Sequence, residues 1–505
     1  MFEFANSLPV LVLKKINLIF FLKLMYKDEK MRKKMINSKL PRSTKIVATI
    51  GTATDETKII KNLIQNGVNV FRLNFSHGNH GDHLKRITYI RTAEKEMNVN
   101  VAILADLQGP KFRIGAVKNE TKVIKGSNYI FDKIPEIGDF KRVNLPHEEI
   151  FKSLSIGSNI LMDDGKLHFK VKDITKDEIK TEVIVGGVVK SNKGVNLPDV
   201  VVKTSPLTPK DIEDLKFILN QEIDWIALSF VQKLKDVEEV KKYIGDKAGI
   251  IAKIEKPSAL EELDEIIQAC DGVMVARGDL GVELPPEEVP GIQKEIILKC
   301  RQAGKPVIVA TQMLESMIEA PSPTRAEASD VATAVFDGAD AVMLSAETAV
   351  GSYPIETVNI MDRIITSAEN HIKNHPGDGP QNLRRENFIY NAVSRSAVSL
   401  AESVSAKAVV AFTASGNTAY RMSRERSNLL LVVMTPDINV KRKLSLLWGA
   451  CPFFSKVQGY EAAIQEAREI IKTQNFAKDG DTIVVVAGMP FGISGSTNSI
   501  RVVEI

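Results

Sequence analysis

The chain has 505 residues, of which 44% are apolar and 26% charged, a composition typical of a globular protein with about two to four domains. Its 67 basic residues nearly balance its 63 acidic residues, and residues 1–42 alone hold 10 basic against 3 acidic ones. The rest of the chain is therefore close to neutral, which argues against nucleic-acid binding, and the longest clean apolar run near the N-terminus, 18–22, is too short for a membrane span.

Residues 1–42 form an N-terminal extension that is basic and poor in acidic residues, as targeting peptides are. A convincing small-residue cleavage site is missing, and a translation start at Met25, Met31 or Met35 is the favoured alternative. We therefore expect a cytoplasmic protein, with targeting to an organelle by residues 1–42 as the alternative. The three cysteines match no metal or redox spacing and fit a reducing compartment.

From residue 43 onward, short runs rich in Val and Ile alternate with longer amphipathic stretches. With one exception the runs are separated by about 20 to 35 residues, the length of a strand–helix unit in a parallel sheet. They predict a closed (β/α)8 barrel, a TIM barrel, over residues 43–110 and 203–370, with its active site at the C-terminal ends of the strands. The eight runs are 45–50, 68–74, 101–106, 224–230, 250–255, 272–276, 306–311 and 341–345.

The exception lies between the third and fourth runs, where residues 111–202 show a different pattern. Short alternating stretches at 159–162, 167–171 and 181–185 are separated by Asp-Gly and Gly-Gly turns, which predicts a small inserted β-barrel domain. Because the insertion follows the end of a strand, it stands over the predicted active site. We expect it to act as a lid.

The last part of the chain, residues 371–505, follows an expected helix at 356–370 and a cluster of Pro and Gly at 375–380. Apolar runs at 408–412, 429–434, 482–487 and 500–504 alternate there with helical patterns. This predicts an open-sheet α/β domain at the C-terminus.

One strand of the expected barrel carries a lysine and a glutamate two residues apart, Lys253 and Glu255. Side chains with this spacing point to the same face of a strand. Asp279 follows the next run closely, and two carboxylates at neighbouring strand ends suit a hard divalent ion such as Mg2+. The alternative is an ordinary salt bridge at a strand end.

Polar residues follow several of the other strands on the same predicted rim. Each one alone could be a helix cap or a solvated loop residue, but together they indicate an active site. They are Arg72, Asn74, Ser76, His77, Asp106, Asp279, Thr311, Ser345 and Glu347.

Long segments of the chain resemble the pyruvate kinase family from about residue 43 to the C-terminus. The segments are FRLNFSHG at 71–78, KIE at 253–255, MVARGDLGVELP at 274–285, VATQMLESM at 309–317, PSPTRAE at 321–327 and DGADAVMLSAE at 337–347. The resemblance implies an enzyme that transfers the phosphoryl group of phosphoenolpyruvate to ADP, which gives pyruvate and ATP in the last step of glycolysis. It also implies a homo-oligomer, usually a tetramer.

The resemblance implies a role for each matching residue. Glu255 and Asp279 would bind Mg2+ or Mn2+, and Lys253 would stabilise charge on the phosphoryl group and the enolate. Further expected roles are phosphate contacts for Arg72 and Arg113, nucleotide contacts for Asn74, His77 and Lys193, binding of the substrate carboxylate at Gly278 and Asp279, and enolate protonation through Thr311 with Ser345 and Glu347.

The family's usual potassium site is only partly matched. Asn74, Ser76, Asp106 and Leu107 match its ligand positions, but Lys111 stands where potassium-requiring members carry a glutamate. An ammonium group there replaces the charge of the ion, so the resemblance implies that K+ is not required.

In the C-terminal domain, residues 413–418 join a strand to a helix, where hydroxyls and backbone N–H groups can bind a phosphate. Residues 495–498 could complete such a site, and the resemblance implies a phosphorylated allosteric effector. A simple helix cap is the alternative.

Two other functions compete with this interpretation. A metal-dependent lyase or aldolase could share the Lys253, Glu255 and Asp279 arrangement, but it would have no nucleotide for Lys193 to contact. A paralogue that binds nucleotide without turnover would be expected to lack one of the catalytic residues, and all of them are present.

Overall fold

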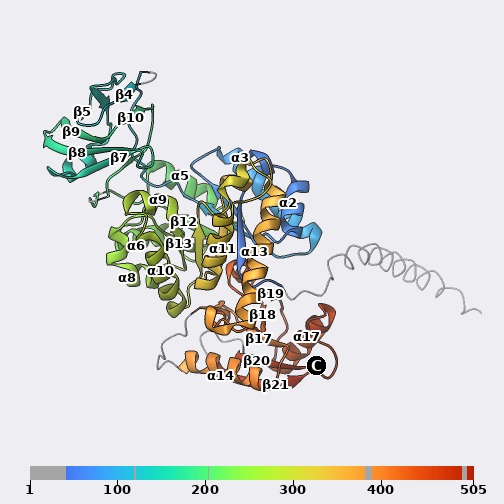
Figure 1. Cartoon of the computed structure of the whole chain (residues 1–505). Coiled ribbons are helices and arrows are strands. Elements are labelled where there is room, and N and C mark those ends of the chain that lie inside the picture. Colours follow the sequence, from blue (N-terminus) through green and yellow to red (C-terminus); the bar gives the residue numbers. More distant parts are fainter. Residues whose placement is uncertain (1–40, 119–120, 199, 203, 381–388, 492–496) are drawn as a thin grey trace, which may run out of the picture.

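The computed structural model describes residues 41–118, 121–198, 200–202, 204–380, 389–491 and 497–505. Three bodies are visible in Figure 1: a central barrel, a β-rich insert beyond α9 and α5, and a C-terminal α/β unit below the barrel. Each body has a hydrophobic core made mainly of its own residues. The predicted fold class is confirmed. Within the described residues, no helix is both long and apolar enough to cross a membrane.

All eight predicted barrel strands are present and parallel, and they close in the order β1-β16-β15-β14-β13-β12-β3-β2. Almost every strand residue is buried on both faces, which explains why the runs are apolar throughout. The strands are β1 (Lys45–Thr49), β2 (Val70–Asn74), β3 (Ala102–Asp106), β12 (Trp225–Leu228), β13 (Gly249–Ile254), β14 (Gly272–Ala276), β15 (Val307–Ala310) and β16 (Ala341–Leu344).

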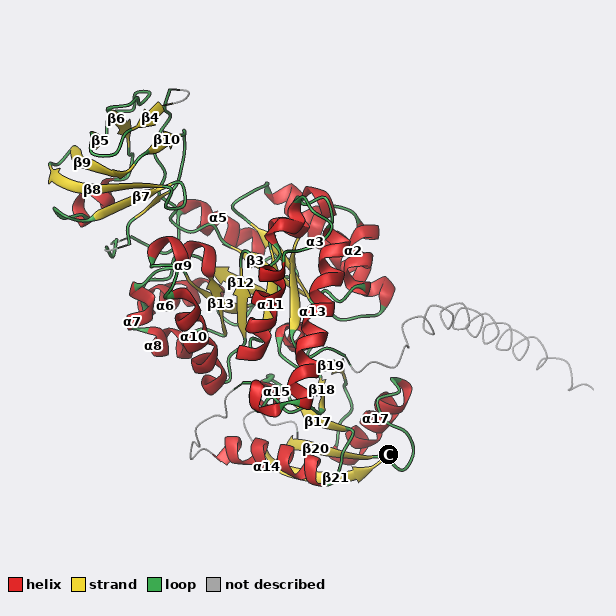
Figure 2. Ribbon diagram, viewed as in Figure 1, coloured by secondary structure: helices red, strands yellow, loops and turns green. Residues whose placement is uncertain are grey.

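Helices surround the barrel (Figure 2), and local signals set where several of them begin. Thr324 accepts a hydrogen bond from the Glu327 amide and Glu327 accepts one from the Thr324 amide, a capping box that starts α11. The helices are α2 (Thr57–Gln65), α3 (His80–Met97), α5 (Pro209–Ile218), α6 (Leu234–Ile244), α7 (Ser258–Glu261), α8 (Leu263–Ala269), α9 (Arg277–Glu283), α10 (Val289–Ala303), α11 (Arg325–Asp337), α12 (Ala346–Ala349) and α13 (Pro354–Asn374). Short 3-10 turns lie at Thr52–Thr54, Glu315–Ile318 and Pro376–Asp378.

The insert contains a six-stranded sheet in the order β11-β7-β8-β9-β5-β6 and a two-stranded sheet of β10 and β4. Alternate residues of β8 and β9 are buried, as their period-two pattern predicts. Its elements are β4 (Thr121–Val123), β5 (Asn128–Asp132), β6 (Arg142–Asn144), α4 (Glu148–Ser153), β7 (Asn159–Met162), β8 (Leu167–Ile174), β9 (Glu178–Val185), β10 (Gly187–Val189) and β11 (Val195–Asn196).

The C-terminal unit is a five-stranded sheet in the order β19-β18-β17-β20-β21, in which β21 is antiparallel to β20. The sheet packs helices on its two faces through two separate apolar clusters. Its elements are α14 (Ile389–Ser403), β17 (Ala408–Phe412), α15 (Asn417–Arg424), β18 (Leu430–Thr435), α16 (Ile438–Lys443), the 3-10 turn η4 (Leu444–Leu446), β19 (Ala450–Phe454), α17 (Tyr460–Thr473), β20 (Thr482–Gly488) and β21 (Thr497–Glu504).

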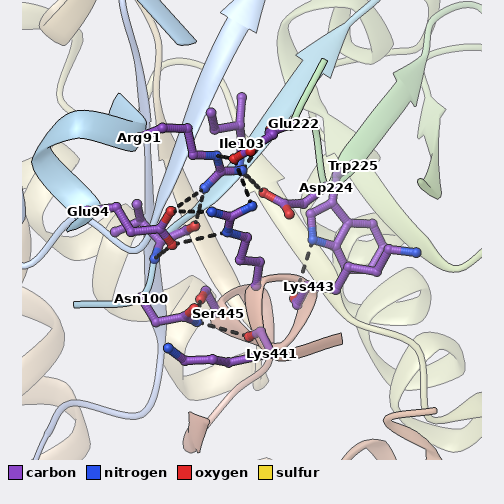
Figure 3. A network of polar contacts seen from close by, with 12 residues as sticks. Arg91, Glu94, Asn100, Ile103, Glu222, Asp224, Trp225, Lys441, Lys443 and Ser445 are labelled. Atoms are coloured by element: carbon purple, nitrogen blue, oxygen red, sulfur yellow. Dashed lines mark hydrogen bonds and ion pairs between the residues drawn. The ribbon is translucent and has the colours of Figure 1, made fainter. Parts of the chain in front are cut away.

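A polar network joins the C-terminal unit to the base of the barrel, at the N-terminal ends of the strands (Figure 3). Arg442 of α16 pairs with Glu94 of α3 at 2.9 Å and with Glu222 at 3.0 Å. Arg91 pairs with Asp224 at 2.6 Å, and Asp224 accepts the Ile103 amide at 2.7 Å. The C-terminal unit is therefore fastened at the end of the barrel opposite the predicted active site.

Candidate active site

The centre of the site is Lys253, which points into the barrel mouth from β13. Its ammonium nitrogen lies 2.8 Å from Glu255, 3.2 Å from Asp106 and 2.7 Å from the Ser229 hydroxyl. Burial alone would lower the pKa of Lys253, but the carboxylates of Asp106 and Glu255 outweigh burial and hold that pKa above its ordinary value. The contacts and the raised pKa both favour a charged, largely buried Lys253 side chain at the mouth of the barrel.

Asp106 joins this cation to a second one. Its other carboxylate oxygen accepts a hydrogen bond from Arg72 Nε at 2.7 Å, and Arg72 also donates to the Thr49 hydroxyl at 3.0 Å. Although burial opposes it, the charges of Lys253 and Arg72 hold the pKa of Asp106 below its usual value. Arg72, Asp106 and Lys253 thus form one fixed row across β2, β3 and β13.

The expected metal ligands lie beside this row. Glu255 directly follows β13 and accepts the Phe230 amide at 2.8 Å, and the half-buried Asp279 lies in the first turn of α9. Burial raises the pKa of Glu255, the Lys253 ammonium opposes this rise, and the charge of Asp279 adds to it. Two carboxylates that repel each other at a buried site fit a divalent cation, whose charge removes the repulsion.

Thr311 follows β15 in a left-handed conformation, with φ at 70°, which is unfavourable for a β-branched residue. Arg277 stabilises this conformation, since its guanidinium donates to the Thr311 carbonyl at 2.6 Å and pairs with Asp330 at 2.6 Å. The Thr311 hydroxyl accepts the Gly278 amide at 2.7 Å and donates to the Ala310 carbonyl at 2.6 Å. The Gly278 N–H is expected to bind the substrate carboxylate. In this structure it donates to the Thr311 hydroxyl instead.

Position 278 has little room for a side chain, because a Cβ there would lie 3.3 Å from the Thr311 hydroxyl, which would have to shift slightly. At the next strand end, the buried Glu347 accepts the Ser345 amide at 2.6 Å and the Leu314 amide at 3.3 Å, and burial raises the pKa of Glu347. The backbone of Ser345 is thus tied to a carboxyl group with a raised proton affinity.

Three of the four expected potassium ligands already contact protein groups, whereas the fourth, Ser76, is exposed. Asn74 Oδ1 accepts the Ser76 amide at 3.1 Å, and the Leu107 carbonyl accepts the Ser229 hydroxyl at 2.8 Å. Asp106 holds Lys253 and Arg72, as described above. Lys111 lies next to the insert: a Cβ on Gly194 would be 3.4 Å from Lys111 Cε.

The expected nucleotide contacts make their interactions elsewhere in this structure. Lys193 pairs with Asp163 at 2.6 Å within the insert, and Arg113 donates to the Asn192 carbonyl at 2.9 Å. His77 is exposed on the loop after β2. Among the described residues, neither Lys193 nor Arg113 forms an ion pair with the carboxylates of the barrel mouth. The structure thus brings the barrel residues of the site together and leaves the insert residues apart from them.

Three residues of the site were not recognised in the sequence. Ser229 and Thr49 contact Lys253 and Arg72, and Arg277 stabilises Thr311, as described above. Ser229 and Thr49 lie within two of the predicted strand runs, and Arg277 lies inside the ARGD motif. Their positions at strand ends were the available signal.

A cavity lies in the C-terminal unit, with a volume of about 580 Å3. Its lining includes Lys456 and the hydroxyl-bearing residues Thr413, Thr418 and Thr497. The Thr413 hydroxyl accepts the Gly416 amide at 2.9 Å, and the hydroxyls of Thr418 and Thr497 are 2.8 Å apart. Gly495 and Ser496, expected to complete this site, lie outside the described residues.

Eight parallel strands with charged residues gathered at their C-terminal ends define a (β/α)8-barrel enzyme. Family models identify which one: the model described as pyruvate kinase, barrel domain, matches residues 41–358, and the model described as pyruvate kinase, alpha/beta domain, matches residues 391–503. The chain belongs to the pyruvate kinase family, and the predicted enzyme class and function are confirmed.

Individual relatives agree with this assignment. A pyruvate kinase of Agrobacterium vitis is 47% identical over 92% of this chain and 97% of its own length. A pyruvate kinase of Methylorubrum extorquens is 45% identical over 92% and 98%. The crystal structure of a pyruvate kinase from Cryptosporidium parvum superposes with a TM-score of 0.85, at 34% identity, over 92% of this chain and 96% of that one.

Proposed function

We propose that the barrel mouth transfers the phosphoryl group of phosphoenolpyruvate to ADP, with Lys253 as the group that stabilises the transferring charge. The observation that carries this is the largely buried Lys253 ammonium in contact with Asp106, Glu255 and Ser229. Phosphoryl transfer depends mainly on positioning and on neutralising charge. The Lys253 ammonium meets this requirement, because its contacts already hold it in place and it need not move when the phosphoryl group is transferred.

Glu255 and Asp279 would hold the divalent ion, and their mutual repulsion supports the assignment. Mg2+ fits the all-oxygen donor set best, and Mn2+ fits it as well. When bound, the ion would neutralise charge on the phosphoryl oxygens. Arg72, which Asp106 and Thr49 hold in place, would contact the phosphoryl group from the side of β2.

The substrate carboxylate would lie at the N-terminus of α9, near the backbone of Gly278 and Asp279. To bind the substrate carboxylate, the Gly278 amide would first have to break its hydrogen bond to the Thr311 hydroxyl. The exchange would free Thr311 to orient the water or relay that protonates the enolate. The raised pKa of Glu347, whose carboxylate accepts the Ser345 amide, supports its place at the end of that relay.

Nucleotide binding would bring the insert toward the barrel mouth, where Lys193 and Arg113 meet the phosphates of ADP. Asn74 and His77, on β2 and the loop after it, would border the nucleotide from the barrel side. A closed insert would also exclude water from the transferring group. Because Asn74, Asp106 and Leu107 hold protein partners and Lys111 would supply a cation, the site would work without K+.

The remaining assignments concern the whole enzyme. The cavity with Lys456 and several hydroxyls would bind a phosphorylated effector. The enzyme would be a homotetramer. It would act in the cytoplasm. The chain would divide into an extension at 1–42, a catalytic barrel at 43–110 and 203–370, a lid at 111–202 and a regulatory domain at 371–505. Limited proteolysis would test these boundaries.

A coupled assay for pyruvate, with phosphoenolpyruvate and Mg2+ in the presence and absence of ADP, tests the function. We expect pyruvate only when ADP is present, with an equal amount of ATP formed. Pyruvate formation that does not depend on ADP would instead indicate a lyase or phosphatase. No pyruvate under either condition would contradict the proposal.

A further inference from the structure

A buried carboxylate outside the catalytic row joins three separate parts of the molecule. Glu283, at the end of α9, accepts a hydrogen bond from Asn196 of β11 at 2.8 Å and pairs through the same oxygen with Lys256. The Glu283 side chain is 1% exposed and the Lys256 side chain 11%. We call Lys256, Glu283 and Asn196 the Glu283 cluster.

The cluster is more than a buried ion pair. Lys256 neutralises the Glu283 charge within the barrel, whereas Asn196 belongs to the insert, so the second contact crosses between the two bodies. A hydrogen bond to an ionised carboxylate is about twice as strong as one between neutral groups. The other oxygen, Glu283 Oε2, has no hydrogen-bond partner among the described residues. One carboxylate oxygen therefore carries both contacts.

Each member of the cluster lies within four residues of an expected residue of the catalytic site. Lys256 directly follows Glu255, and Glu283 ends the short helix that begins near Asp279. Asn196 lies three residues after Lys193. The cluster thus connects the two expected metal ligands to the segment that carries the expected nucleotide lysine.

The segment between Lys193 and Asn196 also contacts Arg113, the second expected nucleotide-binding cation of the insert. Gly194 pairs with Arg113 in a β-bridge, and Val195 pairs with Met162 of β7. The turn that follows β7 also borders α9, since a Cβ on Gly165 would lie 3.9 Å from Val282. Lys193 and Arg113 therefore share one short stretch of sheet whose contact with the barrel includes Asn196.

We propose that Glu283 is a positioning residue, which holds β11 against α9 and thereby sets where Lys193 and Arg113 meet the nucleotide. This inference rests on the proposed nucleotide role of these two cations. Glu283 touches no reacting atom, so the predicted effect is on ADP and not on phosphoenolpyruvate. Loss of the contact lets the insert approach from many orientations, of which few place the cations correctly.

The substitution Asn196→Asp tests the proposal, because it replaces the donor with a carboxylate that Glu283 repels. We expect KM for ADP to rise about tenfold, with KM for phosphoenolpyruvate changed by less than about twofold. Adding Glu283→Gln should restore KM for ADP. In the double variant the new amide at position 283 can donate to the new carboxylate at position 196, and the pair carries the same total charge as in the wild type. Asn128→Asp, the same change at an exposed position of strand β5 in the insert, is the matched control.

Hydrogen exchange of residues 193–196 provides a readout that does not depend on activity. We expect faster exchange in Asn196→Asp and wild-type exchange in the double variant. The inference is overturned if either KM for ADP or the exchange is unchanged in Asn196→Asp, or if the double variant does not recover. Lys193→Met tests the nucleotide role separately: unchanged KM for ADP in that variant contradicts the proposed role of Lys193, while the exchange still reports on Glu283.

Discussion

Asp106 determines the charge arrangement of the site, although it is neither the expected phosphoryl-stabilising group nor an expected ligand of the divalent ion. Both of its oxygens are occupied, one by Lys253 and one by Arg72. A buried carboxylate between two cations holds both of them in place. The position of the phosphoryl-stabilising charge therefore depends on a residue of a different strand.

The residue Lys111 gives a prediction about monovalent ions. Wild-type activity should change by less than about twofold when K+ is replaced by tetramethylammonium at equal ionic strength, because the Lys111 ammonium supplies the charge. Lys111→Glu should lose activity without K+ and regain it when KCl is added. A strong K+ requirement of the wild type, measured in the coupled assay, would contradict this prediction.

His83 gives a prediction about pH. Its ring stacks on Phe75 with centroids 4.0 Å apart, and burial, followed by the charge of Arg86, lowers its pKa to about 4. The unfolded chain titrates near pH 6.5, so between about pH 6.5 and 4 the unfolded state binds the extra proton. The contribution of the neutral His83 ring to the free energy of unfolding is therefore complete above about pH 6.5. It decreases as the pH falls toward 4, by at most about 1.4 kcal/mol for each pH unit.

Urea unfolding of wild type and His83→Gln at several pH values in this window measures the effect. We expect the difference in unfolding free energy between the two proteins to change with pH in the direction just given. A constant difference would mean that His83 takes up its proton equally in both states.

Sequence reasoning identified the residues of the site better than their partners. Lys253, Glu255 and Asp106 lie at strand ends, and the pattern of the strands determines such positions. The contact between Thr311 and the Gly278 amide could not be predicted, because it depends on a left-handed backbone at Thr311 that Arg277 stabilises. The pairing of Lys193 with Asp163 depends likewise on how the insert folds.

At the scale of elements, the barrel strands were predictable because each is a continuous apolar run with both faces buried. Strand β19 was missed, since Pro452 interrupts its pattern, and an edge strand tolerates such a residue. Five strands of the insert, β4, β5, β6, β10 and β11, were also missed. Most of them have two to three residues, too few for an alternating pattern to be recognised.

The first residue of β13 gives a prediction at this scale. Gly249 lies beside Trp225 of β12, and a Cβ there would be 2.5 Å from two ring carbons of the indole. Because Trp225 is fully buried, Gly249→Ala should destabilise the protein by about 1 to 3 kcal/mol. Gly291→Ala in α10 is the control: a Cβ there meets nothing within 4 Å, and we expect a change between zero and about 1 kcal/mol of stabilisation.

Denaturant unfolding followed by tryptophan fluorescence measures both variants. Equal stability of Gly249→Ala and wild type would show that the indole moves without cost. The Trp225 indole also donates to the Lys443 carbonyl at 3.3 Å, so its displacement would reach the C-terminal unit.

At the scale of the whole molecule, the bodies are joined at opposite ends of the barrel. The insert meets α9 at the C-terminal ends of the strands, and the C-terminal unit meets the barrel at their N-terminal ends, through the network of Figure 3. Further contacts of this lower interface are Arg426 with Asp340 at 2.9 Å and Lys45 with the Ala450 carbonyl at 2.9 Å. A signal from the cavity of the C-terminal unit to the barrel mouth would therefore have to pass along the barrel.

Arg442 gives a prediction for this interface. Arg442→Leu removes its pairs with Glu94 and Glu222, and we expect a loss of about 1 to 3 kcal/mol, because these groups are only partly buried. Calorimetry should then show the C-terminal unit unfolding before the barrel. Lys299→Leu breaks an exposed ion pair with Asp264 within the barrel and should change the unfolding temperature little. A single unshifted transition in Arg442→Leu would contradict the prediction.

We infer that the Lys253 ammonium stabilises the transferring phosphoryl group, and the substitution Lys253→Met tests this claim. Lys233→Met, the same change at an exposed position, is the control. We predict that Lys253→Met lowers kcat for ATP formation by about a hundredfold to a thousandfold, while phosphoenolpyruvate still binds in the presence of Mn2+. Equal kcat in Lys253→Met and wild type would contradict the claim.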